Sequence, residues 1–230
     1  MSSSRAWAAS VKTPGDDHSQ VVIFGGVDQK NDTLNSIEVL DMKSKKLIRI
    51  GLSLPVPLAG HCAVQLNSSH TFIAGGAVQG LAGFEESANF SSRAWILDES
   101  GWTPIGHLNQ ARSIHACSTV MNGAGELEVL VVGGIGLSKV GTRMILDSVE
   151  IYNVNTKKWR NGPKTSLPLF GAGFLELSGQ PMLLGGRYQM EENLQQSDSS
   201  YIYQNLWRTS TIRLRNPRDF AVTVEAPAFC

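Results

Sequence analysis

Short apolar runs that end in a glycine pair recur four times along the chain. The runs are residues 21–24, 71–74, 129–132 and 182–184, and the pairs are Gly25–Gly26, Gly75–Gly76, Gly133–Gly134 and Gly185–Gly186. Each run has the length of a β-strand and is too short for a helix. The pattern therefore predicts four copies of one structural unit that begins with a buried strand and a sharp change of chain direction.

A second and a third strand follow each glycine pair. Large residues are spaced regularly on them: Tyr152 and Trp159 are seven positions apart, as are Trp95 and Trp102, and Leu40 and Leu47, whereas Tyr201 and Trp207 are six apart. Polar turn residues lie between the members of each pair, which is typical of a β-hairpin. A further strand rich in small residues then closes each unit. We see no helical periodicity and predict an all-β chain.

These strands divide the chain into repeat units of roughly 21–66, 71–120, 128–177 and 181–225, within one domain of residues 1–230. A lone N-terminal strand is expected at 5–12, and a similar strand at 218–224. The closing strand is thus present five times against four glycine pairs. This surplus predicts either a chain that stops one strand into a further blade, or a last strand that pairs elsewhere and covers an exposed edge.

A glycine pair after an apolar strand, followed by a Tyr and a spaced Trp, resembles the kelch repeat. The third unit, with Gly133–Gly134, Tyr152 and Trp159, is the best match, and Trp102 and Trp207 hold the Trp position in two others. The resemblance implies a β-propeller of four-stranded antiparallel blades. Kelch propellers commonly have six blades, whereas this chain supplies about four, so we expect an incomplete kelch-type β-propeller in which these residues are structural.

Composition narrows the classes of partner. The 20 basic and 20 acidic residues cancel without forming a basic block, which argues against nucleic acid. No apolar stretch reaches the roughly 20 residues of a membrane span, and no signal peptide is apparent, so a cytoplasmic protein without membrane contact is expected. Cys62, Cys117 and Cys230 are an odd number without framework spacing and are expected to be reduced thiols.

No pattern of catalytic or cofactor-binding residues emerges. Gly133–Gly134 and Gly136 resemble part of a dinucleotide-binding loop, but Lys139 stands where its third glycine is required. His61 with Cys62, and His115 with Cys117, occupy equivalent positions of different repeats, which would be held apart, whereas a structural zinc site needs about four converging ligands. We therefore expect no catalytic residues, no cofactor and no metal.

Function is expected in the loops after the glycine pairs, because their lengths and chemistry differ while the flanking strands repeat. In kelch propellers of the substrate-adaptor type, arginines near these loops bind acidic peptide motifs. The resemblance suggests Arg112, Arg187, Tyr188 and Arg143 as partner-binding residues, the alternative being ordinary exposed loop residues.

The expected function is a non-catalytic protein–protein interaction module that binds a protein partner, or an acidic peptide motif in one, through one face. One alternative is the substrate-recognition part of a BTB-kelch ubiquitin-ligase adaptor. A less favoured alternative is an enzyme scaffold like galactose oxidase, whose copper would need convergent ligands that the five histidines do not provide locally.

Overall fold

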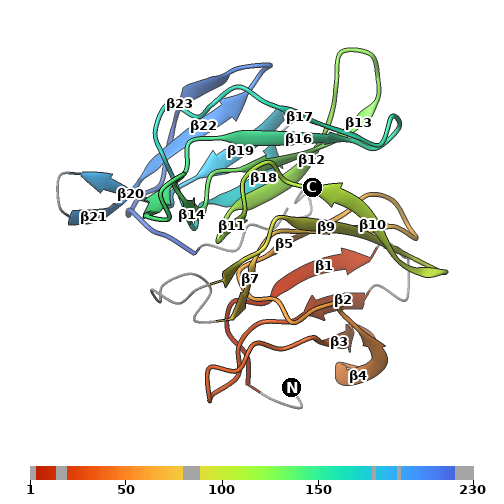
Figure 1. Cartoon of the computed structure of the whole chain (residues 1–230). Helices are drawn as coiled ribbons and strands as arrows, with labels where there is room; N and C mark the ends of the chain where they lie inside the picture. Colours follow the sequence, from red (N-terminus) through yellow and green to blue (C-terminus); the bar gives the residue numbers. More distant parts are fainter. Residues whose placement is uncertain (1–3, 14–19, 80–88, 178–179, 191–192, 221–230) are drawn as a thin grey trace. The chain divides into compact units, whose positions relative to one another are not determined.

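The computed structural model describes residues 4–13, 20–79, 89–177, 180–190 and 193–220. None of these residues forms a helix, as the sequence predicted. The chain divides into two compact units, Met1–Ile114 and His115–Cys230, each of which contains two four-stranded antiparallel sheets. Figure 1 shows the four sheets in colours that follow the sequence.

The first unit contains the sheets of the first two repeats. The first sheet has the order β1-β2-β3-β4, and the second has the order β10-β9-β6-β5. The strands are β1 (Ala9–Thr13), β2 (Gln20–Phe24), β3 (Ser36–Asp41), β4 (Lys46–Ser53), β5 (Cys62–Gln65), β6 (Thr71–Ala74), β9 (Arg93–Asp98) and β10 (Gly101–His107). The first strand of one sheet lies against the first strand of the other, β1 against β5.

The second unit repeats this plan. Its sheets have the orders β12-β13-β16-β17 and β18-β19-β22-β23. The strands are β12 (Ala116–Met121), β13 (Leu127–Val132), β16 (Val149–Asn153), β17 (Lys158–Asn161), β18 (Gly173–Leu177), β19 (Gln180–Leu184), β22 (Ser199–Tyr203) and β23 (Trp207–Arg213). Strand β12 lies against β18 and β19 of the neighbouring sheet.

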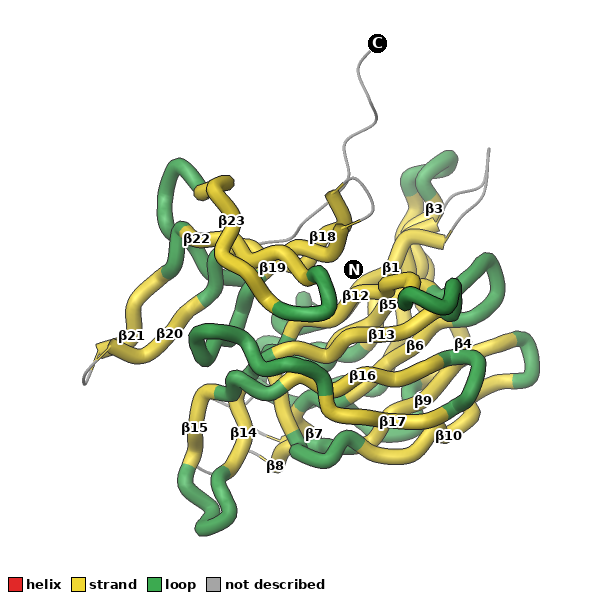
Figure 2. The backbone as a smooth tube through the Cα atoms, turned by 90° about the horizontal axis from the view of Figure 1, so that it is seen from above, coloured by secondary structure: helices red, strands yellow, loops and turns green. Residues whose placement is uncertain are grey.

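Shorter strands lie outside these sheets, in the segments that follow the glycine pairs. They are β7 (Ala77–Gln79) with β8 (Asn89–Phe90), β14 (Ile135–Leu137) with β15 (Arg143–Ile145), and β20 (Arg187–Met190) with β21 (Asn193–Gln196). A two-residue strand, β11 (Arg112–Ser113), precedes β12. Figure 2 shows β14–β15 and β20–β21 as narrow hairpins that project from the sheets of the second unit.

The strand pairing in the sheets corrects the residue at which each predicted repeat unit begins. The strand expected to stand alone at 5–12 is β1, which pairs with β2 from Ala9↔Phe24 to Thr13↔Gln20. Each strand predicted to close a unit is likewise the first strand of the next sheet. The error has a simple cause: a cyclic pattern of four strands has the same order of residues wherever counting starts. The expected strand at 218–224 falls mostly outside the described residues.

The structure also corrects which residue lies opposite the tryptophan in two of the hairpins. Tyr152 pairs with Trp159 as expected, but Trp207 pairs with Tyr203, where Tyr201 had been assigned. The two aromatic pairs have the same geometry, with ring centroids 5.2 Å apart in both. Trp102 pairs with Leu97, where Trp95 had been assigned. The paired residues Tyr203 and Trp207 are thus four positions apart, against seven for Tyr152 and Trp159, because the turn between β22 and β23 is shorter than the turn between β16 and β17.

Each unit has its own apolar core. In the second unit Leu130, Val132, Val149 and Ile151 of the third sheet belong to one buried cluster with Trp207 of the fourth. Alternating residues of a strand face one side of the sheet, so one face of each blade is available to pack on the next.

In the first unit the buried cluster includes Phe24, Ile37, Ile73 and Trp95. Trp102 of β10 reaches the first sheet: its ring lies edge-on to that of Phe24 at 6.3 Å, and its indole nitrogen donates a hydrogen bond to the Ser53 carbonyl oxygen at 2.8 Å. The tryptophan thus contributes both apolar area and a satisfied polar group between blades.

Candidate functional site

The glycine pairs set the direction of the loops in which function is expected. The amide of Gly134 donates a hydrogen bond to the Leu169 carbonyl oxygen at 2.7 Å, and Gly26, Gly76 and Gly186 make the equivalent bond to Leu58, Arg112 and Arg218. Gly133 has a φ of 63°, and a Cβ there would collide with the same Leu169 oxygen. Only glycine fits this combination of a left-handed backbone and close approach. The pair therefore fastens each sheet to the segment that leads into the next.

The hairpin β14–β15 carries exposed apolar side chains. Leu137, Val140 and Met144 are all exposed, Val140 by 87%. The hairpin is held by pairing from Ile135↔Ile145 to Leu137↔Arg143 and by a turn in which the Ser138 amide bonds to the Thr142 carbonyl oxygen. Arg143, a predicted partner-binding residue, lies exposed on β15.

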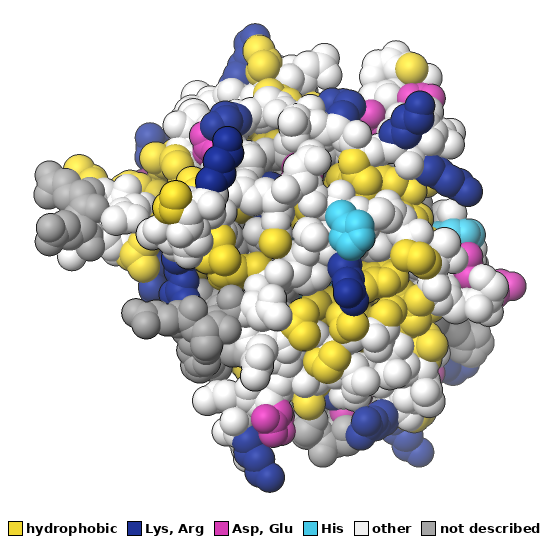
Figure 3. Space-filling view, viewed as in Figure 1, with side chains coloured by type: hydrophobic (Ala, Val, Ile, Leu, Met, Phe, Trp, Pro, Cys, Tyr) yellow, Lys and Arg dark blue, Asp and Glu magenta, His cyan; other side chains and the backbone are white. Residues whose placement is uncertain are grey.

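The hairpin β20–β21 carries two more exposed apolar side chains, Met190 and Leu194. Figure 3, drawn from the same direction as Figure 1, shows hydrophobic side chains on the surface on the side where this hairpin projects. Met190 pairs with Asn193 and Leu194 pairs with Gln189, so the two exposed apolar side chains lie on opposite faces of the hairpin. The two hairpins emerge from the glycine-pair ends of neighbouring sheets.

Arg187 and Tyr188 begin β20 but are already engaged within the chain. Arg187 forms an ion pair with the mostly buried Asp219, and its guanidinium carbon lies 6.0 Å from the centre of the Phe220 ring. The Tyr188 hydroxyl donates a hydrogen bond to Gln195 across the hairpin at 3.2 Å. Arg187 is about one-third exposed, so it combines an internal role with an accessible edge. Partner contact by either residue stays a prediction.

Arg112 is placed differently from what the sequence suggested. Its side chain is fully buried, with 0% exposure, and its Nε donates a hydrogen bond to the Gln110 carbonyl oxygen at 3.3 Å. A buried guanidinium needs internal partners, because its charge is costly to remove from water. Arg112 is therefore not presented to a partner in this conformation, and its predicted binding role remains untested.

Arg5 shows what an arginine at this repeat position does. The Ala6 amide donates a hydrogen bond to Val27, the residue directly after Gly25–Gly26, and the Ala59 amide donates the equivalent bond to Ala77, directly after Gly75–Gly76. Arg5 precedes Ala6 as Leu58 precedes Ala59. Arg5 therefore holds the same repeat position as Leu58 and, in the following repeat, Arg112.

The guanidinium of Arg5 forms a buried ion pair with Glu38 of β3 at 3.2 Å, both side chains being 1% exposed. It also donates hydrogen bonds to the carbonyl oxygens of Gly25 and Ser36, at 3.0 and 3.2 Å. This position thus ties an incoming segment to the glycine-pair end of a blade. Sequence reasoning missed this ion pair, since Arg5 and Glu38 lie far apart in sequence and match no motif.

The cysteines correct another expectation. Cys62 and Cys117 are disulfide-bonded, whereas reduced thiols had been predicted; Cys230 lies outside the described residues. Their spacing gave no sign of this, because disulfide formation depends on proximity in the fold and not on sequence separation.

The histidine of the His61–Cys62 pair is a buried core residue. Burial lowers the pKa of His61 to about 4. Within the described residues, no group of three or more His, Cys, Asp or Glu side chains is arranged to hold a metal ion. In the same part of the chain, no helix is long and apolar enough to cross a bilayer.

Taken together, repeated four-stranded antiparallel blades, each with a glycine pair at the end of its second strand, define a kelch-type β-propeller fold. The comparison with solved structures agrees: the structure of YjhT superimposes with a TM-score of 0.71 at 17% identity, covering 95% of this chain and 73% of that one. At this identity the likeness concerns the fold alone.

Sequence relatives carry the same repeat in their names. The chain is 33% identical over 122 residues to "Kelch repeat and BTB domain-containing protein 12" of Danio rerio, covering 50% of this chain and 19% of the relative. The human protein of that name is 29% identical, with 67% of this chain and 25% of the relative covered.

"Putative protein tag-53" of Caenorhabditis elegans is 26% identical, over 80% of this chain and 15% of the relative. No family model matches the chain. The chain spans a quarter or less of the length of these three relatives. The two relatives named for kelch repeats, together with the structural match, confirm the kelch-repeat resemblance.

Proposed function

We propose that the chain is a non-catalytic protein–protein interaction module that binds its partner through the hairpins after the glycine pairs of the second unit. The observation that carries the proposal is the group of exposed apolar side chains on β14–β15 and β20–β21, which project from a rigid scaffold. The likeness to kelch-repeat proteins supports an interaction role of this kind.

Charge on the same hairpins suggests the chemistry of the partner. Arg143 is exposed on β15 and Arg187 is partly accessible on β20, so two guanidinium groups accompany the apolar side chains. Arginine binds carboxylates through two parallel hydrogen bonds, and apolar contacts supply the area that a single ion pair lacks. A partner segment with apolar side chains and at least one carboxylate fits this surface.

Affinity capture from cell extracts, followed by calorimetry with the captured partner, tests the proposal. The variant Leu137→Ser/Met144→Ser/Met190→Ser/Leu194→Ser should bind at least about ten-fold more weakly, because truncating buried contact residues removes most of the binding energy. Ile48→Ser, at an equally exposed position on β4, is the matched control and should bind like the wild type. An unchanged dissociation constant in the four-fold variant would sink the proposal.

The substrate-recognition role in a BTB-kelch ubiquitin-ligase adaptor is a finer version of this proposal. It is supported by the BTB domain in the names of two relatives. Ubiquitylation of the captured partner that depends on Arg143 and the hairpin residues is the expected result, and a partner whose modification ignores those variants would contradict it. An enzyme scaffold of the galactose-oxidase type receives no support from a cluster of ligands among the described residues.

Residence in the cytoplasm is also part of the proposal, but the disulfide-bonded state of Cys62 and Cys117 counts against it. Disulfides persist mainly in oxidising compartments. Alkylation of free thiols in freshly lysed cells distinguishes the two: modified Cys62 and Cys117 are expected for a cytoplasmic protein, and protected ones for a protein exposed to an oxidising compartment.

A further inference from the structure

The turn between β5 and β6 carries an asparagine whose carboxamide is fixed on one side and free on the other. The Oδ1 atom of Asn67 accepts hydrogen bonds from the backbone amides of Ser69 and His70, both at 2.9 Å, and from the Ser69 hydroxyl at 3.2 Å. Its Nδ2 atom donates no hydrogen bond to any other described residue. Residues 67–69 are all exposed, so the turn offers a free carboxamide nitrogen at the surface.

The sequence of this turn gives the free nitrogen a chemical meaning. Asn67-Ser68-Ser69 is an Asn-x-Ser triplet, the acceptor sequence for an asparagine-linked glycan. Such a triplet carries little weight by itself, because three-residue matches also arise by chance. Here the atom that receives the sugar in this modification, Nδ2, is the unused one, and the hydroxyl that the triplet requires lies against the same carboxamide.

Two other triplets of this kind, at residues 31–33 and 89–91, are placed less favourably. The middle residue of the first is an acid, Asp32, whereas Ser68 is uncharged. In the second, the residue that carries the hydroxyl, Ser91, is only 6% exposed. Of the three triplets, 67–69 is the one in which every residue is exposed.

Open space lies beside this turn. A hollow of about 450 Å³ is lined by Lys12, Thr13, Gln65, Leu66, Asn67 and Ser68. The turn lies at the end of the second blade opposite its glycine pair, because β6 runs from the turn directly into Gly75–Gly76. A sugar on Asn67 therefore has room beside it and lies away from the loop that follows the glycine pair.

The cysteines provide a second and independent observation. Cys62 and Cys117 are disulfide-bonded. Disulfides form and persist in the endoplasmic reticulum and outside the cell, and they are rare in the cytosol. The lumen of the endoplasmic reticulum is also where asparagine-linked glycans are attached to exposed triplets. Glycosylation of Asn67 and residence in the cytoplasm exclude each other, and the oxidised cysteines favour glycosylation.

Asn122, in the corresponding turn of the third blade, has a different environment. Its Oδ1 atom also accepts backbone hydrogen bonds, from the amides of Ala124 and Glu126 at 2.9 and 3.0 Å. The residue two positions further on is Ala124, which has no hydroxyl, so this turn is not an acceptor triplet. Asn122 is therefore a matched control for Asn67.

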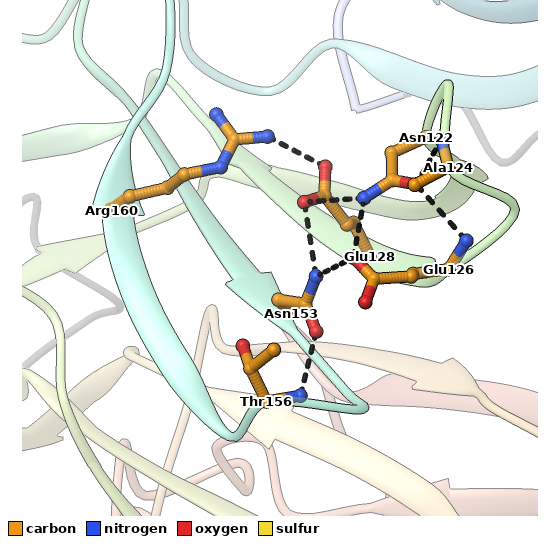
Figure 4. A network of polar contacts seen from close by, with 7 residues as sticks. All are labelled: Asn122, Ala124, Glu126, Glu128, Asn153, Thr156 and Arg160. Atoms are coloured by element: carbon orange, nitrogen blue, oxygen red, sulfur yellow. Dashed lines mark hydrogen bonds and ion pairs between the residues drawn. The ribbon is translucent and has the colours of Figure 1, made fainter.

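The Nδ2 atom of Asn122 is bound in a cluster with two carboxylates (Figure 4). It donates hydrogen bonds to Glu126 Oε2 at 3.0 Å and to Glu128 Oε1 at 3.3 Å. Asn153 Nδ2 donates to the same two oxygens, at 2.8 and 3.4 Å, and Arg160 forms an ion pair with Glu128 at 2.7 Å. Both hydrogens of the Asn122 amide nitrogen are thus used within the fold.

We propose that Asn67 is an asparagine-linked glycosylation site. Its Nδ2 atom attacks the anomeric carbon of an oligosaccharide carried on a lipid diphosphate, so a carbon–nitrogen bond forms and the bond from that carbon to the diphosphate oxygen breaks. The lipid diphosphate leaves with the electron pair, Nδ2 gives up one proton to a base of the transferase, and no atom changes its oxidation state. Transfer precedes folding, so the fold has only to keep the modified side chain at the surface, as this turn does.

Mass spectrometry of the protein purified from cells that make it naturally tests the proposal. Peptide N-glycosidase in water labelled with heavy oxygen converts a glycosylated asparagine into labelled aspartate and leaves an unmodified asparagine as it is. Labelled aspartate is expected at position 67, and unlabelled asparagine at position 122. Unlabelled asparagine at position 67 in all of the protein would overturn the proposal.

Three substitutions in the exposed turn locate the sugar. Asn67→Gln removes the acceptor atom, and Ser69→Ala removes the hydroxyl while keeping Asn67, so both should lose the mobility shift that the glycosidase causes. Ser68→Ala changes the exposed serine between them, keeps the triplet intact and should retain the shift. An undiminished shift in both Asn67→Gln and Ser69→Ala would refute the site. None of these changes touches the hairpins of the second unit, so partner capture reports on the proposed function separately.

Discussion

His61 makes the stability of the protein depend on pH in a way that can be worked out from its surroundings. The imidazole is 6% exposed, and neither ring nitrogen has a hydrogen-bond partner among the described residues. Burial alone lowers its pKa from 6.5 to about 4. A protonated imidazole would lose its hydration there and gain nothing in return. The folded protein therefore keeps His61 neutral at a pH where the unfolded chain would protonate it.

The sign and the size follow from proton linkage. Above pH 6.5 neither state binds the proton, so His61 does not make stability vary with pH. Between pH 6.5 and about 4 the unfolded chain binds more protons, and stability falls as the pH falls. A difference of about 2.5 units corresponds to about 3 kcal/mol in total, of which about 2 kcal/mol is already lost at pH 5. That loss is a large share of the roughly 5–15 kcal/mol that stabilises a typical protein.

Urea unfolding followed by tryptophan fluorescence at pH 7, 6 and 5 measures the effect. The informative variant is His61→Ala. In the first and fourth blades an alanine already occupies the equivalent position: Ala8 packs against Gly26 and Ala172 against Gly186, as His61 packs against Gly76. Alanine therefore fits this place in the fold. The wild type should lose about 2 kcal/mol more than His61→Ala between pH 7 and pH 5. The exposed-residue control His107→Ala should follow the wild type. Parallel pH profiles for wild type and His61→Ala would refute the reasoning.

Two further substitutions probe the scaffold. Gly133→Ala should lower the free energy of unfolding by about 3 kcal/mol or more, because the added Cβ meets a backbone oxygen at a left-handed φ. Gly51→Ala, with open space around it, should lower it by well under about 1 kcal/mol. Equal melting temperatures of the two variants would contradict this. Arg5→Ala should cost about 3–5 kcal/mol in urea unfolding because it leaves Glu38 buried without its cation. Lys164→Ala removes only an exposed ion pair and should change stability by less than about 1 kcal/mol, so equal losses in the two variants would count against the buried pair.

The sequence was sufficient for the strands and the blades because their signals are local. A glycine pair directly after an apolar run marks the same turn in every repeat, and the structure places all four pairs there with positive φ. The strand that begins each sheet could not be predicted from local sequence. Whether the strand after Trp7 closes one blade or opens another depends on which neighbour it pairs with, and β1 pairs with β2.

Burial was the second limit of sequence reasoning. Arg112 and Arg143 are both arginines beside predicted loops, yet one is fully buried and the other is exposed. The difference depends on tertiary neighbours, as Arg5 illustrates through its contact with Glu38, 33 positions away in the chain. The Glu126–Glu128 cluster escaped notice for the same reason: its acids are close in sequence, but Asn153 and Arg160 complete it from strands that the sequence cannot place beside them.

The second unit thus presents two chemically different surfaces at opposite ends of the same blades. Glu128 begins the buried part of β13 and Gly133 follows its end, so the ends are separated by about 15 Å of strand. The glycine-pair end offers apolar side chains and arginines, and the other end offers carboxylates and amide oxygens. Substitutions this far apart without shared partners act independently. Glu126→Gln, which changes only the hydrogen-bonded cluster of Glu126 with Asn122 and Asn153, should therefore leave hairpin-dependent capture unchanged. Loss of capture in Glu126→Gln would mean that the blade itself had been disrupted.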